Sequence, residues 1–215
     1  MDKIICVGRN YEEHVNEMVK IAGDAKSGKP VLFLKPPSSI FYLSAGNTST
    51  PANIELPFHR GAVHFECEMV FRLKASKNTL TPAQAENHIS AVALGLDLTL
   101  RDLQTEIKKA GKPWDIAKVF KNSAIVSPFT QITDYKQILD YVFSFERDGR
   151  TLQNASPSQM ILKPNECVAY ASEFFEICDG DLLFTGTPSG VGPLDTSSEY
   201  TLNLKNELKW KVKFH

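Results

Sequence analysis

The sequence lacks the features that mark nucleic-acid-binding and membrane-spanning proteins. Its 24 basic and 25 acidic residues give a formal net charge of −1, and Lys and Arg form no clustered run. No electrostatic attraction toward nucleic acid or an anionic membrane surface is therefore expected. No apolar run approaches the roughly 20 residues that a membrane-spanning helix needs.

Cysteine and histidine are also scarce, and their spacing excludes several metal sites. The four cysteines include no CxxC pair, and buried reduced thiols are predicted for Cys6, Cys67 and Cys178 because their neighbours are apolar. The five histidines form no HxH or HExxH motif, which argues against a zinc hydrolase or a histidine-rich iron site. The chain opens on a strand-like segment without a signal or transit pattern, so a cytoplasmic protein is expected.

What the sequence does contain is alternation of apolar and polar residues. Its 215 residues, 42% of them hydrophobic, suit one domain with a sizeable core. Strands are predicted from this pattern at 4–8, 30–36, 62–73 and 91–100, and hairpins at Asp148-Gly149 and within 200–214. Helices are fewer and are expected after Asn10 as a cap, over 101–111 with Gly111 as C-cap, and from Pro164. A polar loop is expected at 19–29. The fold class predicted is a β-rich α+β domain covering residues 1–215.

The stretch HFECEMVF (64–71) places two carboxylates on one strand face. Side chains alternate along a strand, so Glu66 and Glu68 share a face opposite an apolar one. A solvated edge explains such a pair, and so does a site for a hard cation. Oxygen ligands favour Mg²⁺, Mn²⁺ or Ca²⁺ over zinc. His64 shares this face, either as a neighbour of the site or as a partly exposed side chain.

Asp97 favours the metal interpretation. It lies in the second strongly alternating segment, on a face of alanine, glycine and threonine that predicts open space above it. If the two strands bring these faces together, Glu66, Glu68 and Asp97 form a three-carboxylate site. The alternative is that Asp97 caps the helix that follows, although Thr99 is better placed for that role.

Three other segments carry candidate chemistry. His14 and Glu17 are three residues apart on one helix face, where a carboxylate can orient an imidazole as a general base; spacing alone favours an ordinary surface pair. Lys118 is a lone lysine in an apolar run, pointing either outward or toward an anionic partner inside. The segment LFTGTPSGVG lacks the GK[ST] ending and the GxGxxG order of nucleotide loops. There the Thr187 hydroxyl and nearby N–H groups could hold a carboxylate.

Six stretches occur in an order that is familiar as a set: GRNYEEHVNEM, PVLFLKP, HFECEMV, LGLDLTLRDLQ, PWDIAKVF and FTGTPSGVG. With them the chain resembles the fumarylacetoacetate hydrolase family over nearly its whole length, specifically its small acylpyruvate hydrolase and oxaloacetate decarboxylase members. The resemblance implies a mixed β-roll around a metal site, a homodimer, bound Mg²⁺ or Mn²⁺ (or Ca²⁺ in a crystal), and a lid helix and loop over 9–30. The residues it assigns are metal ligands Glu66, Glu68 and Asp97, catalytic groups His14, Glu17 and Lys118, and substrate contacts Arg9, Arg101, Gln104 and Thr187.

The function implied is cleavage of a C–C bond in a small 2-oxo acid, by acylpyruvate hydrolysis or oxaloacetate decarboxylation. A metal would act as a Lewis acid for a pyruvate enolate, and His14 would activate water. One alternative is an isomerase, tautomerase or hydratase of 2-oxo or 2-hydroxy dienoate diacids, which needs the same enolate. A further alternative is a non-catalytic protein that binds α-keto acids. The polar residues 23–29 depart locally from the family pattern, and they leave the substrate open.

Overall fold

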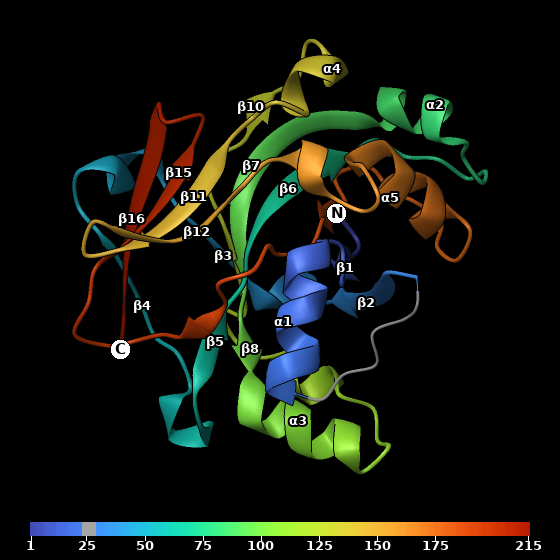
Figure 1. Ribbon diagram of the computed structural model, residues 1–215. Coiled ribbons are helices and arrows are strands. Elements are labelled where there is room, and N and C mark those ends of the chain that lie inside the picture. Colours follow the sequence, from blue (N-terminus) through green and yellow to red (C-terminus); the bar gives the residue numbers. More distant parts are fainter. Residues whose placement is uncertain (23–28) are drawn as a thin grey trace.

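The computed structural model describes residues 1–22 and 29–215, which form a strand-rich α+β fold, as predicted (Figure 1). An eight-stranded sheet has the order β2-β1-β13-β6-β7-β9-β3, and β10 also pairs with β7. Its strands are β1 (Ile4–Gly8), β2 (Val31–Lys35), β3 (Ile40–Tyr42), β6 (Cys67–Leu73), β7 (Ile89–Asp97), β9 (Ala124–Val126), β10 (Thr130–Gln131) and β13 (Leu182–Phe184).

Two smaller sheets and a few helices complete the described residues. One sheet has the order β12-β11-β15-β16-β4 and the other β14-β5-β8. Their strands are β4 (Ala52–Ile54), β5 (Val63–Phe65), β8 (Thr99–Leu100), β11 (Phe143–Arg147), β12 (Arg150–Ala155), β14 (Gly192–Pro193), β15 (Tyr200–Leu204) and β16 (Leu208–Phe214). The α-helices are α1 (Glu12–Ala22), α2 (Pro82–Ala85), α3 (Arg101–Lys109), α4 (Tyr135–Ile138) and α5 (Pro164–Ser172).

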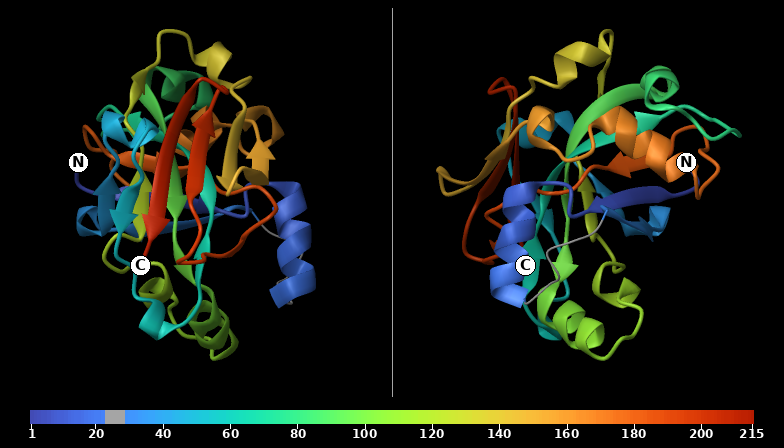
Figure 2. Two further views of the ribbon diagram at one scale, coloured as in Figure 1. Left: turned by 90° about the vertical axis from the view of Figure 1, so that its left-hand side faces the viewer. Right: turned by 45° about the vertical axis from the view of Figure 1, so that its right-hand side comes forward.

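The long antiparallel pair β6 and β7 curves through the middle of the molecule, between the five-stranded sheet and the β1–β2 region (Figures 1 and 2). The side chains on its two faces belong to two different hydrophobic clusters. Met69 and Leu94 belong to the large core, while Val70 and Ala93 belong to a second, smaller cluster with Phe184. Because side chains two apart share a face, the acidic residues of these strands continue the face of the smaller cluster.

Both long predicted strands are interrupted near the acidic residues. The segment 62–73 divides into β5 and β6 at Glu66, and 91–100 divides into β7 and β8 at Leu98. The halves belong to different sheets, since β6 pairs with β7 while β5 pairs with β8. Period-two alternation continues across each break, so the sequence pattern did not reveal it.

The predicted hairpins and two helix ends are confirmed. β11 and β12 flank Asp148-Gly149, and β15 pairs with β16. Gly111 follows α3 with φ of 64°, a conformation that favours glycine, and α5 begins at Pro164.

Two predicted caps and part of a predicted loop are wrong. The Asn10 side chain is buried and donates to the carbonyls of Leu162 (2.9 Å) and Thr185 (2.8 Å), so tertiary contacts replace the cap. Thr99 Oγ1 donates to the Asp97 carbonyl instead of capping α3. The expected loop 19–29 begins as helix, because α1 continues to Ala22, and residues 23–28 lie outside the described part.

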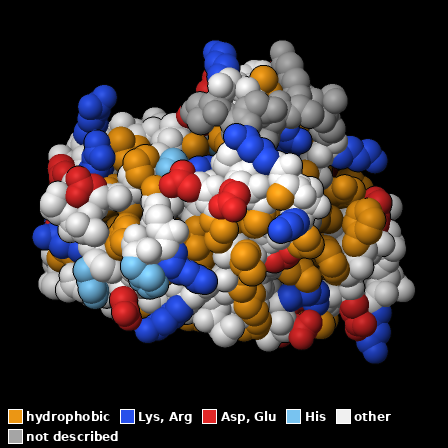
Figure 3. Space-filling view, turned by 90° about the horizontal axis from the view of Figure 1, so that it is seen from below, with side chains coloured by type: hydrophobic (Ala, Val, Ile, Leu, Met, Phe, Trp, Pro, Cys, Tyr) orange, Lys and Arg blue, Asp and Glu red, His pale blue; other side chains and the backbone are white. Residues whose placement is uncertain are grey.

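Two of the three cysteines that were predicted to be buried are buried. All four cysteines are free; Cys6 and Cys67 are buried as predicted, whereas Cys178 is only half-buried. In the described residues no helix is long and apolar enough to cross a membrane. On the face seen from below Figure 1, acidic and basic side chains are interspersed around apolar ones (Figure 3).

Candidate metal centre

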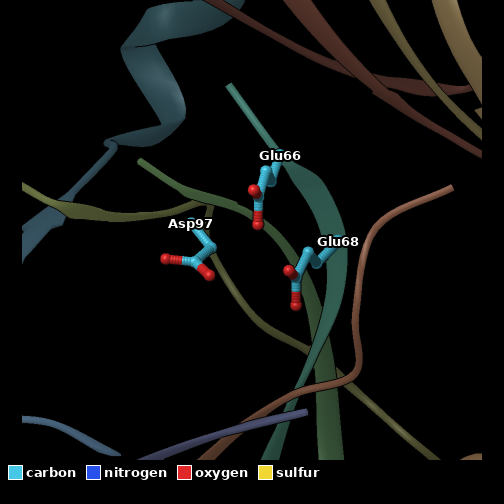
Figure 4. A group of neighbouring side chains, drawn as sticks. All are labelled: Glu66, Glu68 and Asp97. Carbon is cyan, nitrogen blue, oxygen red and sulfur yellow. The ribbon is translucent and has the colours of Figure 1, made fainter. Parts of the chain in front are cut away.

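Glu66, Glu68 and Asp97 form one buried cluster. Each offers a carboxylate oxygen, and these atoms all lie within 4.8 Å of one another. The three side chains converge from adjacent strand segments (Figure 4). Their exposures of 6%, 2% and 1% exclude the solvated-edge interpretation.

Strand register brings the three carboxylates together. The Asp97 N–H donates to the Glu66 carbonyl at 2.8 Å, and Glu68 pairs with Gly95. The predicted open space above this face is wrong at Gly95, where a Cβ atom would meet Phe184 and Val70 at 2.7 Å. Glycine is needed here because the sheet is closely covered, and the cavity opens beyond it at Asp97.

Lys118 points into the cluster. It follows a 3₁₀ turn, Asp115–Ala117, so it is not an outward-facing strand residue. Its Nζ lies 2.8 Å from Glu66 Oε2 and 2.6 Å from Asp97 Oδ2. Burial opposes the charge, but these two carboxylates raise the pKa of Lys118 to about 12. The ammonium therefore stays protonated at neutral pH.

The surroundings shift the pKa values of Glu66 and Glu68 in opposite directions. Burial opposes ionisation of Glu66, yet Lys118 and Arg101 lower its pKa. Burial together with the charges of Asp97 and Glu66 raises the pKa of Glu68 well above its usual range. Glu68 accepts the Gly186 N–H at 2.7 Å, which does not offset that repulsion.

These features fit a hard divalent cation. Three buried oxygen atoms surround one point, and at Glu68 burial and the charges of Asp97 and Glu66 outweigh the nearby charge of Lys118. Asp97 Oδ1 is buried and lies 2.8 Å from Lys35 Nζ, but in the described residues it accepts no hydrogen bond of good geometry. An oxygen-only set suits Mg²⁺ or Mn²⁺ better than zinc. A cation here would stabilise the ionised forms of all three groups.

α1 brings His14 to the same cavity and places Glu17 behind it. The His14 side chain is buried, and Nδ1 donates to Glu17 Oε2 at 3.1 Å. Glu17 Oε1 also accepts the Gly190 N–H at 3.1 Å, which fixes the carboxylate against the turn after β13. The pair is therefore not the ordinary surface pair that spacing alone favoured.

The four expected substrate contacts also line the cavity. Arg101 donates to Glu66 and to Gln104 Oε1 (2.7 Å), and its buried Nε has no acceptor among the described residues. Arg9 adopts φ of 65° at the turn leading to α1. The Thr187 hydroxyl donates to the Cys67 carbonyl at 3.0 Å, so a substrate carboxylate would compete for that proton.

The cavity has a volume of about 300 Å³ and contains nine of the ten predicted residues, with Glu17 behind His14. Its remaining wall includes Met18, Phe33 and Trp114. His64 does not line the cavity; burial and the Arg101 charge lower its pKa.

Sequence reasoning missed two supporting residues. Lys35 is fully buried, and its Nζ lies 2.8 Å from Asp97 Oδ1. The signal was present, since Lys35 ends an apolar run just as Lys118 interrupts one. Gln153 donates to Thr187 Oγ1 at 2.8 Å; an isolated glutamine in a hairpin strand gives no such signal.

Two known proteins are similar to this chain in sequence over most of its length. An oxaloacetate tautomerase of Escherichia coli is 36% identical over 203 residues, covering 94% of this chain and 88% of that protein. A mitochondrial oxaloacetate tautomerase of Bos taurus is 33% identical over 210 residues, covering 98% and 90%.

Solved structures of other proteins have a similar fold. A fumarylpyruvate hydrolase from Pseudomonas aeruginosa, in complex with Mn²⁺ and pyruvate, superposes with a TM-score of 0.89 at 32% identity, covering 99% of this chain and 88% of that one. A 5-carboxymethyl-2-hydroxymuconate delta-isomerase from Mycobacterium smegmatis has a TM-score of 0.79 at 26% identity, covering 99% and 78%. The model of the fumarylacetoacetate (FAA) hydrolase C-terminal domain matches residues 3–213, and the chain therefore belongs to the fumarylacetoacetate hydrolase family.

Proposed function

We propose that this chain is a divalent-metal-dependent enzyme that cleaves a C–C bond in a small 2-oxo acid. Acylpyruvate hydrolysis is the reaction favoured, with oxaloacetate decarboxylation on the same site. The observation that carries the proposal is the His14–Glu17 pair in one cavity with the buried carboxylates of Glu66, Glu68 and Asp97.

The three carboxylates would hold Mg²⁺ or Mn²⁺, which supplies a Lewis acid for the 2-oxo group. Lys118 holds Glu66 and Asp97 in place, and its fixed positive charge stabilises negative charge that develops nearby. Arg9, Arg101, Gln104 and Thr187 are proposed to position the substrate carboxylate.

His14 is the proposed general base. Because Nδ1 donates to Glu17, the neutral imidazole keeps a lone pair on Nε2. Nε2 takes a proton from water as the water oxygen bonds to the distal carbonyl carbon of the acylpyruvate. The C3–C4 bond then breaks, its electron pair passes into the pyruvate enolate, and the proton is returned to C3.

Tautomerisation is the second candidate, favoured by the two relatives named oxaloacetate tautomerases. It requires removal and return of a C3 proton, and His14 could perform both transfers without an activated water. Isomerisation of dienoate diacids also requires removal and return of a proton. The structural neighbour from Mycobacterium smegmatis is named as a delta-isomerase.

A substrate panel tests these proposals. Purified protein is assayed with acylpyruvates, enol and keto oxaloacetate, and ring-cleavage diacids, each with Mg²⁺, Mn²⁺ or EDTA. Pyruvate release from acylpyruvates that EDTA abolishes supports the hydrolase. Turnover confined to oxaloacetate enol–keto exchange supports the tautomerase. Binding of 2-oxo acids without metal-dependent turnover supports the non-catalytic alternative and contradicts both enzymes.

The organisation of the chain is proposed on separate grounds. Residues 1–215 are proposed as one catalytic domain with 9–30 as a lid, because His14 and Met18 of α1 line the cavity. A homodimer is proposed because the family resemblance implies one; light scattering tests it. A cytoplasmic location is proposed from the free cysteines, and cell fractionation tests it.

A further inference from the structure

Lys35 is a buried cation outside the cavity. It is the last residue of β2, and its side chain is fully inaccessible to solvent. A buried lysine is costly unless anionic or polar partners surround the ammonium. It does not line the cavity in the described residues, so it cannot contact the substrate directly.

The partners of Lys35 all belong to segments that carry site residues. Its ammonium donates to the carbonyls of Ser123 (2.9 Å), Leu98 (3.3 Å) and Lys118. Leu98 directly follows Asp97, and Ser123 ends a turn that begins at Phe120, two residues after Lys118. One ammonium therefore joins the backbone next to a candidate metal ligand to the backbone of the lysine that pairs with it.

The contact with Asp97 differs from these three. Nζ lies 2.8 Å from Oδ1, yet Oδ1 accepts no hydrogen bond, so the attraction is electrostatic. Asp97 is thus held between two cations, with Lys118 at Oδ2 and Lys35 at Oδ1. This arrangement orients the carboxylate, while the hydrogen bonds of the ammonium are made to the three carbonyls.

We propose that Lys35 is a positioning residue, which holds the Asp97 carboxylate and the Lys118 backbone in register so that Asp97 can ligate the metal. The inference rests on the proposed function, because it assigns Lys35 a role toward the metal that the carboxylates would hold. Groups that orient metal ligands typically contribute about 10-fold to 100-fold to metal affinity or activity.

The test compares Lys35→Met with Lys35→Gln and with a matched control. Methionine keeps length but loses charge and donors; glutamine retains two N–H donors. The control is Lys3→Met, because Lys3 pairs with the buried Asp181 at 2.9 Å, outside the site. Metal-free protein is titrated with Mn²⁺ and free ion is followed by electron paramagnetic resonance. Circular dichroism first shows that each variant is folded.

We expect Lys35→Met to weaken Mn²⁺ binding by about 10-fold to 100-fold, Lys35→Gln to weaken it less, and Lys3→Met to leave it unchanged. At saturating Mn²⁺, kcat falls in Lys35→Met while KM changes little, because Lys35 does not touch the substrate. If Lys35→Met does not fold, Lys35→Gln alone decides, with weaker Mn²⁺ binding than in Lys3→Met as the supporting result.

Three results would overturn the inference. Unchanged Mn²⁺ affinity in a folded Lys35 variant means a purely structural role. Tighter binding means that Lys35 acts only as a competing charge. Equal weakening in Lys3→Met means a general loss of stability. Absence of Mn²⁺ and Mg²⁺ binding in the unaltered protein overturns the proposed function itself, and the role of Lys35 with it.

Discussion

Glu17 joins two segments that are far apart in the sequence, because its carboxylate accepts the N–H of Gly190 at 3.1 Å. The same carboxylate orients His14 through Nδ1. Nearby, Ser189 donates to Glu13 at 3.1 Å, which adds a second contact between α1 and the turn. The geometry of the proposed base therefore depends on the turn after β13 as much as on the helix that carries it.

Replacement of His14 by alanine should abolish acylpyruvate hydrolysis, since a positioned general base contributes typically 10²-fold to 10⁴-fold. Decarboxylation of oxaloacetate should fall less, because it needs no activated water. Steady-state kinetics on both substrates measure the difference. Glu12→Gln, an exposed position on the same helix and outside the cavity, serves as the control. Full hydrolysis by His14→Ala would rule out the base role.

Replacement of Glu68 by glutamine should remove the stabilisation that Mg²⁺ or Mn²⁺ confers on the protein. At a metal concentration of about 100 times Kd, binding raises the free energy of unfolding by about 2.7 kcal/mol. The metal-free variant should be at least as stable as the parent, because burial and like charges raise the pKa of Glu68. Thermal unfolding with and without metal tests both statements, and an unaltered metal response in the variant contradicts the ligand assignment.

The Asp181→Asn variant should show a stability loss that depends on pH. Asp181 is buried and accepts N–H groups of Asp2 (2.8 Å), Lys3 (3.0 Å) and Cys178 (2.9 Å). Burial opposes its charge, but these N–H donors and the Lys3 ammonium lower its pKa below 3.8. The stability that Asp181 contributes is therefore fully present above the pKa it has in the unfolded chain. It is lost as the pH falls through the lower pKa that it has in the folded protein.

Hydrogen bonds to a charged group contribute about 1.5–3 kcal/mol, which is the loss expected for Asp181→Asn at pH 7. Urea unfolding at pH 7 and near pH 3 measures the change. An equal deficit at both pH values would show that the carboxylate charge is not involved.

Replacement of Gln153 by leucine should weaken both stability and substrate binding. Gln153 accepts the Cys67 N–H at 3.0 Å and donates to Thr187 Oγ1 and to the Pro188 carbonyl, both at 2.8 Å. Unpaired buried groups cost about 1–3 kcal/mol, and release of Thr187 should raise KM. Denaturant titration and kinetics measure these effects against the exposed Gln137→Leu. A variant with unchanged KM would separate Thr187 from substrate positioning.

The sequence was informative where local periodicity governs structure. Alternation at Glu66 and Glu68 correctly placed both on the face opposite Cys67 and Met69. It could not reveal the break at Glu66, because the two halves separate according to which distant strand each one meets. The crowding over Gly95 was hidden for the same reason, since Phe184 comes from a strand almost ninety residues away.

For isolated polar residues, too, the sequence predicted some features correctly and others wrongly. Lys118 was recognised as unusual because it interrupts an apolar run, and the structure supplied its partners. Asn10 resembled a helix cap, yet its partners Leu162 and Thr185 lie more than 150 residues away in the chain. Short-range signals identify candidates for burial, whereas the choice of partner depends on the assembled fold.

The pairing of β1 with β13 has a consequence for the order of folding. Ile4 lies beside Leu182 in a parallel pair, and α1 rests on the turn at 186–190. Contacts of such long sequence separation slow folding, because a long stretch of chain must be ordered before they form. During synthesis, His14 emerges from the ribosome early but gains its support only after residue 190 has followed. Closure of the cavity around His14 should therefore follow the recovery of secondary structure on refolding.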